Sequence, residues 1–72
     1  MNLSDRLTKI AMKFSLDQQI EEVEREINMR ESVYPGWIAR GKIRRSAAEY
    51  HMDRMRAVLE TLKGLKDGAK KQ

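Results

Sequence analysis

Hydrophobic positions recur at helical spacing in two long segments of the chain. In the first segment the apolar side chains stand four, three, four and seven residues apart: Leu16, Ile20, Val23, Ile27 and Tyr34. In the second they form another stripe of the same kind: Ala48, Met52, Met55, Leu59 and Leu62. Steps of three and four place side chains on one face of an α-helix, whereas a half-buried strand alternates apolar and polar residues. The pattern therefore predicts two amphipathic helices.

Local signals predict the ends of the first helix. Ser15, followed three residues later by Gln18, matches a capping box, in which each side chain bonds to the backbone of the other residue. Pro35 is expected to end or kink this helix, because proline has no N–H donor and its ring clashes with the preceding turn. The sequence leaves open which of the two outcomes occurs.

Candidate capping and termination residues also flank the second helix. Ser46 and Glu49 form a candidate capping box, although a start two residues earlier also fits the pattern. Lys63 and Gly64 are the residue types that commonly close a helix. Residues 65–72 are then expected to form a frayed basic tail.

The first 14 residues carry a third, shorter stripe. Its apolar residues repeat at four, three and four: Leu3, Leu7, Ile10 and Phe14. The polar side of this segment carries Arg6, Lys9 and Lys13, so the pattern predicts a short basic amphipathic helix. We expect this helix to pack on the rest of the chain or on a second subunit, rather than to lie on an anionic membrane.

The two long helices should form an antiparallel hairpin, since only about ten residues connect them. Residues 16–32 hold six acids and two arginines, a net charge of −4, whereas residues 40–56 hold six bases and two acids, a net charge of +4. Opposite charge on facing helices favours one alignment. The predicted organisation is an N-terminal helix over residues 1–14, a helical hairpin over residues 15–64 and a tail over residues 65–72.

A chain of 72 residues without cysteine has few means of stabilising itself. Cores of this size supply about 3–5 kcal/mol, and disulfides, metals or oligomerisation usually make up the difference. We therefore predict that the all-α hairpin is completed into a helical bundle by homo-oligomerisation. The residues expected at the oligomer interface are Leu16, Ile20, Val23, Ile27, Met52, Met55, Leu59 and Leu62.

The composition argues against an enzyme and against a cofactor. The chain has no cysteine and a single histidine, His51, and the glutamates of the first helix have no Glu-x-x-His motif beside them. No glycine-rich phosphate loop is present, and the serines sit at predicted helix caps or surfaces. No apolar run is long enough to span a bilayer, and charges interrupt the first 15 residues. We expect a cytoplasmic binding protein.

The connector between the long helices is the most unusual region of the sequence. It holds two of the four aromatic residues, Tyr34 and Trp37, and four of the fifteen bases, which are Arg40, Lys42, Arg44 and Arg45. Arg30 lies on the apolar stripe just before it. Aromatic rings beside guanidinium groups can hold a planar anionic ligand by stacking and bidentate pairing, so these seven residues form the candidate ligand site. The alternative is that Tyr34 and Trp37 only cap the core of the hairpin.

A family resemblance covers about residues 20–63. The residues that carry it are Arg25-Glu26-Ile27, Met29-Arg30, Val33-Tyr34-Pro35, Trp37-Ile38, Gly41-Lys42-Ile43, Ala48, Met52, Met55 and Leu59. In this pattern the chain resembles a group of short, mostly uncharacterised phage and prophage proteins. It departs from them at Arg44, where a serine or threonine cap is common. The resemblance implies a bacterial host cytoplasm as the setting and gives no mechanism.

These observations lead to one expected function and two alternatives. The leading expectation is a phage-type accessory protein that sequesters or blocks a host component, such as an anionic nucleotide signal used in defence. The alternative is an inhibitor or adaptor of a host protein, since methionine-rich helical faces adapt to partner helices. Nucleic-acid binding agrees with the net charge of +4 but has no evident recognition helix, and the acidic first helix would repel phosphates.

Overall fold

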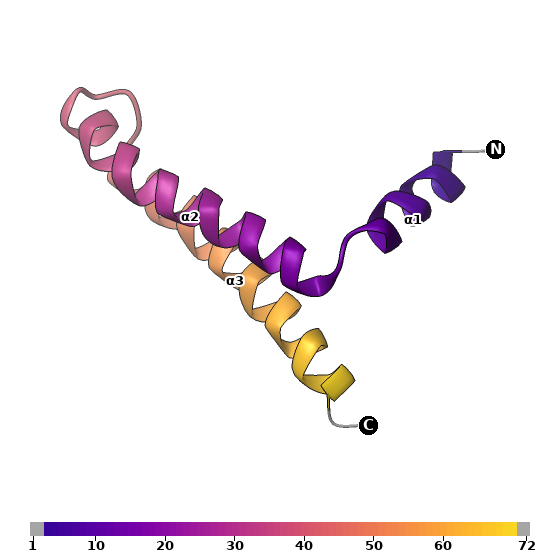
Figure 1. Cartoon of the computed structure of the whole chain (residues 1–72). Coiled ribbons are helices and arrows are strands. Elements are labelled where there is room, and N and C mark those ends of the chain that lie inside the picture. The colour runs from indigo at the N-terminus through magenta and orange to yellow at the C-terminus, as the bar shows by residue number, and fades with distance from the viewer. Residues whose placement is uncertain (1–2, 71–72) are drawn as a thin grey trace.

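The computed structural model describes residues 3–70, which form three helices and no strand. The helices are α1 (Leu3–Lys13), α2 (Leu16–Ala39) and α3 (Arg45–Lys70). Figure 1 shows α2 and α3 side by side as a long antiparallel hairpin, with α1 projecting away from the end opposite the connecting loop. Within the described residues, α2 and α3 are the two helices that pack against each other. The predicted all-α class and helical hairpin are confirmed.

The start of α2 follows the sequence signal. The backbone N–H of Gln18 donates to Ser15 Oγ at 3.1 Å, and the backbone N–H of Ser15 donates to Gln18 Oε1 at 2.9 Å. Both halves of the predicted capping box are therefore present. They satisfy donors that the first turn of a helix cannot bond internally.

Pro35 neither ends nor breaks α2, which continues through it to Ala39. A proline inside a helix costs about 3 kcal/mol, because one hydrogen bond is lost and the ring crowds the preceding turn. Packing on either side of Pro35 offsets this cost: Tyr34 is buried in the core, and Ile38 packs partly against it. Of the two outcomes that the sequence left open, an end of the helix at Pro35 does not occur, because tertiary contacts outweigh the local preference.

The actual end of α2 is a glycine turn at Gly41. Its φ of 73° lies in the left-handed region that glycine adopts without strain. The N–H of Gly41 donates to the carbonyl of Ile38 at 3.0 Å, and the N–H of Lys42 donates to the carbonyl of Trp37 at 2.8 Å. These two bonds make a Schellman motif, which closes α2 and turns the chain toward α3.

The start of α3 follows the earlier of the two starts that the sequence left open, whereas its end differs from the prediction. The N–H of Ala48 donates to the carbonyl of Arg44 at 3.0 Å, so the cap position falls on Arg44 and Ser46 lies within the first turn. At the other end the helix passes through Gly64 and Gly68 to Lys70.

The expected helix stop at Gly64 and the frayed tail from residue 65 are therefore wrong as far as Lys70, and residues 71–72 lie outside the described residues. One contact favours this longer helix: the ammonium of Lys66 pairs with Asp17 in the first turn of α2. This contact ties the last turns of α3 to the hairpin. It acts against the cost of about 1 kcal/mol that each helical glycine carries, but an exposed pair of this kind is too weak to offset both glycines by itself.

The core of the hairpin is small and lies within one chain. Its buried residues are Ile27, Tyr34, Ala48 and Met52, and six more apolar side chains pack partly against them: Val23, Val33, Ile38, Ile43, Met55 and Leu59. Between the helices, Arg56 pairs with Glu31 at 2.9 Å, an exposed contact of the kind that contributes at most about 1 kcal/mol.

The predicted oligomer interface needs correction at three of its eight residues. Ile20, Ile27 and Met52 are only 7–8% exposed in the single chain, so they are not free to meet a second subunit. Val23, Met55 and Leu59 pack partly on the same core, and Leu16 and Leu62 are half-buried. The two stripes cover each other because the turn at Gly41 brings them face to face.

Candidate binding surface at the hairpin tip

The tip of the hairpin, residues 37–45, lies at the end of the molecule farthest from both termini (Figure 1). It comprises the last turn of α2, the glycine turn and the first residue of α3. All four predicted basic residues of the connector lie here with exposed side chains: Arg40, Lys42, Arg44 and Arg45. The structure therefore gathers these four residues at one place.

The charge of the tip is not compensated from within residues 3–70. None of the four basic side chains takes part in the ion pairs of this part of the chain, which join Arg25, Arg30, Arg56 and Lys66 to acids of α2. Four like charges over six residues create a positive potential that attracts an anionic partner. The tip is thus the place where unpaired positive charge gathers in the described part of the chain.

The two aromatic residues of the connector have different surroundings. Tyr34 is 9% exposed and belongs to the core with Ala48 and Met52. Trp37 is 38% exposed, and its ring centroid lies 5.6 Å from that of Tyr34 at a tilt of 49°. Tyr34 thus agrees with the alternative in which it packs in the core of the hairpin, whereas Trp37 keeps part of its ring open to solvent.

Arg30 also differs from its predicted role. Its Nε donates to Glu26 Oε1 at 2.8 Å, one helical turn away, and both side chains are partly shielded from solvent. The hydrogen bond to Glu26 raises the pKa of Arg30, partial burial opposes this effect, and the Tyr34 hydroxyl adds to the increase. The charge on the apolar stripe is therefore paired within α2.

A shallow groove of about 330 Å³ runs along the hairpin beside the tip. Apolar side chains from both helices contribute to its lining, among them Ile38 and Met52. Charged residues also line it: Arg45 comes from the tip, Glu49 follows in α3, and the paired Glu31 and Arg56 lie farther along. An apolar side chain fits this groove better than a phosphate, because the groove is partly apolar and its charged lining carries both signs.

Residues 3–70 show no cluster of histidine, cysteine, aspartate and glutamate that could hold a metal ion. None of the helices in the same range combines the length and hydropathy that a bilayer span requires. Comparison of the chain with protein-family models, with curated proteins and with solved structures gives no match.

Sequence reasoning missed two features of this region. Glu26 precedes Arg30 by four residues, a spacing that favours an ion pair on a helix and was available as a signal. The groove beside the tip had no such signal, because its walls come from two helices whose register is set only by packing. The four exposed bases could be found from composition alone.

Proposed function

We propose that the protein is a non-enzymatic binding protein that holds an acidic segment of a partner protein at the tip of its hairpin. The observation that carries this proposal is the group of four exposed basic side chains without acidic partners: Arg40, Lys42, Arg44 and Arg45. A carboxylate-bearing partner would supply the missing countercharges and accept bidentate hydrogen bonds from the guanidinium groups.

The surroundings of the tip favour a protein partner over a small ligand. Sites for small molecules are concave and bury most of the ligand surface. The groove beside Arg45 is shallow and partly apolar, which suits an apolar anchor side chain next to the acidic residues. The half-exposed Trp37 adds a residue type that often dominates the energy of protein interfaces.

An anionic nucleotide is the second candidate, and Trp37 is the observation that favours it. Its ring is partly open beside the four bases, so a base could stack on it while phosphates meet the arginines. Only one aromatic face is offered, however, because Tyr34 belongs to the core. In a phage setting, which the resemblance implies, either partner would be a host component that the protein sequesters or blocks.

The single tryptophan of the chain makes a direct binding assay available, since Trp37 lies at the tip and reports on it by fluorescence. The probe is a synthetic peptide of alternating aspartate and glutamate around one leucine. A matched peptide with asparagine and glutamine in place of the acids serves as its control. We expect saturable binding of the acidic peptide that weakens as salt is added, because exposed charges are screened.

Charge-matched variants separate the tip from the overall basicity. Replacing Arg40 and Arg44 by glutamine should weaken binding about tenfold, a loss of about 1.4 kcal/mol. Replacing Arg54 and Lys63, which are exposed on α3, by glutamine removes the same charge and should change affinity less than about twofold. Equal losses in the two variants, or no binding of the acidic peptide, would contradict the proposal. Tighter binding of ATP than of the peptide would favour the nucleotide.

A further inference from the structure

Four exposed apolar side chains form one stripe along α1 and the residue that follows it. Its side chains are 48–69% exposed: Leu3, Leu7, Ile10 and Phe14. No residue of α1 is buried, and the helix projects away from the hairpin (Figure 1). Exposing four large apolar side chains on one stripe to water is unfavourable, and such stripes commonly mark interaction surfaces.

Hydrogen bonds hold α1 in this projecting position. The side-chain amide of Gln19 donates to the carbonyl of Phe14 at 2.9 Å and to the carbonyl of Ala11 at 3.4 Å. These bonds satisfy carbonyls at the end of α1 that have no partner within the helix. Because the capping box at Ser15 starts α2 directly afterwards, α1 and α2 are joined by a short elbow, capped on both sides.

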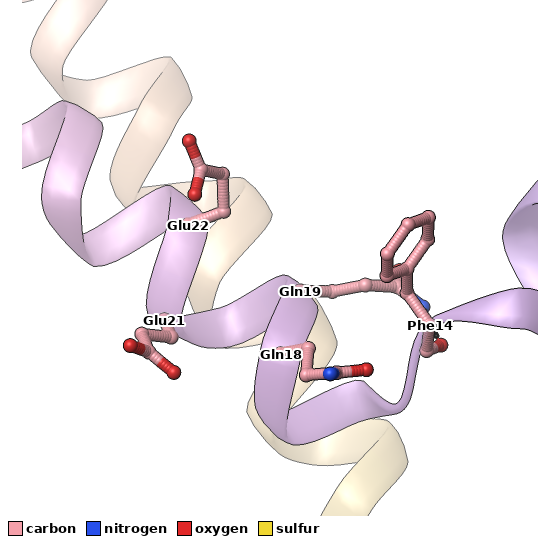
Figure 2. Close-up of a pocket in the computed structure, with 5 residues that line it drawn as sticks. All are labelled: Phe14, Gln18, Gln19, Glu21 and Glu22. Carbon is pink, nitrogen blue, oxygen red and sulfur yellow. Dashed lines mark hydrogen bonds between the residues drawn. The ribbon is translucent and has the colours of Figure 1, made fainter.

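An open hollow of about 500 Å³ lies at the elbow, lined by Phe14, Gln18, Gln19, Glu21 and Glu22. Figure 2 shows the Phe14 ring and the Glu22 carboxylate rising on the same side of α2, the Glu21 side chain pointing to the other side, and the Gln19 side chain reaching toward Phe14. Glu21 forms no ion pair within residues 3–70, and the exposed Glu22 has only a 3.7 Å contact with Arg25. The hollow is therefore apolar at Phe14 and anionic along α2.

The segment with the complementary chemistry is α1 itself. Its apolar stripe is flanked by Arg6, Lys9 and Lys13, and with Asp5 the helix carries a net charge of +2. The chain's own α1 does not fill the hollow: none of its residues lines it, and the Gln19 amide bonds to carbonyls at the end of this outward-pointing helix. A second copy can, and two identical elbows related by a twofold axis would fill each other's hollows.

We propose that the elbow is a homodimer interface in which α1 of each copy docks into the hollow of the other. Leu7 and Ile10 of one copy pack against Phe14 of its partner, and Arg6 and Lys13 meet Glu21 and Glu22. The tip lies at the opposite end of the hairpin, so this dimer leaves both tips free (Figure 1). An anionic membrane is the weaker alternative, since the glutamates next to α1 would be brought toward like-charged headgroups.

The test uses the full chain and sedimentation equilibrium. We expect a concentration-dependent dimer whose dissociation constant rises at least about tenfold in Leu7→Gln. Met12→Gln is the matched control: Met12 is 81% exposed on the polar side of the same helix, and its replacement should change the constant less than about twofold. Far-UV circular dichroism of each variant checks that the helices are retained. A wild-type chain that stays monomeric, or a dimer that Leu7→Gln leaves unchanged, would overturn the proposal.

Charge reversal gives a sharper form of the test. The variant Arg6→Glu/Lys13→Glu and the variant Glu21→Lys/Glu22→Lys should each be monomeric. In each variant, α1 of one copy and the hollow of the other carry charge of the same sign and repel each other. Mixed together they should form a heterodimer, since each α1 then meets a hollow of opposite charge. Failure of the mixture to associate overturns the elbow interface. Binding of the monomeric wild-type chain to phosphatidylserine vesicles, abolished by Leu7→Gln, would assign α1 to a membrane instead.

Discussion

The hairpin and α1 have the same kind of amphipathic pattern, but their apolar faces have opposite surroundings. Ile27 and Met52 are 7% and 8% exposed, whereas Leu7 and Ile10 are 56% and 49% exposed. The difference arises at the ends of the helices. Gly41 turns α3 back onto α2, while the elbow with Gln19 directs α1 outward. A stripe of apolar residues thus defines a face, and the geometry of the turn beside it decides what covers that face.

The largest expected effect comes from truncating one side chain in each region. Ile27→Ala should lower the free energy of unfolding by about 2–4 kcal/mol, because it leaves a cavity in the small core. Leu7→Ala should change it by less than about 0.5 kcal/mol, because Leu7 is already in water. Both values are measured by urea denaturation in protein dilute enough to be monomeric. Equal losses would mean that α1 is covered within its own chain, and the comparison would fail.

A smaller effect is expected at the turn that closes the hairpin. Gly41→Ala should cost about 1–2 kcal/mol, because an L-residue is strained in the left-handed region. No atom lies within 4 Å of a side chain added there, so the loss would come from backbone strain alone.

The matched control for this turn is Gly64→Ala, which also meets no neighbouring atom but lies within the helical residues of α3. It should stabilise the protein by about 0.5–1 kcal/mol, since alanine loses less backbone freedom than glycine in a helix. Thermal unfolding followed by circular dichroism compares the two variants. A gain in stability from Gly41→Ala would show that this turn does not control the pairing of α2 and α3.

The smallest effect concerns the ion pair at the open end of the hairpin. The hydrogen bond to Asp17 raises the pKa of Lys66 above its ordinary value of 10.5. A group whose pKa is higher in the folded state stabilises the protein fully below its unfolded value and loses that contribution as the pH rises through the folded value. Stability should therefore fall slightly above pH 10.5.

Lys66→Met supplies the reference for this pH dependence. Urea midpoints of the wild-type chain and the variant are compared from neutral pH to strongly alkaline pH. Their difference should shrink once Lys66 is deprotonated, because the charge that the variant lacks is then lost in both. A difference that stays constant across this range would show that Lys66 contributes through packing of its methylenes.

The sequence predicted the helices and their hairpin better than it predicted their ends. The capping box at Ser15 and the exposed bases of the tip were found from local pattern alone. The sequence left the effect of Pro35 open, and its stop signal at Gly64 misled. Both are local preferences of a few kcal/mol at most, and tertiary contacts such as the packing of Tyr34 and the Lys66–Asp17 pair act against them. Two glycines, Gly36 and Gly41, follow Pro35 in the sequence, and residue type alone does not tell which of them ends α2. The structure places the end at Gly41 and leaves Gly36 inside the helix.

What the sequence alone determined is the helical character of three segments, the face of each that is apolar and the places where charge accumulates. These properties depend on the spacing of side chains along one helix, which the order of residues specifies directly. Tertiary structure decided that Tyr34 lies in the core, that Arg30 is paired and that α1 is left uncovered. Such outcomes depend on the direction in which each turn sends the chain, and on many small contacts between residues distant in sequence.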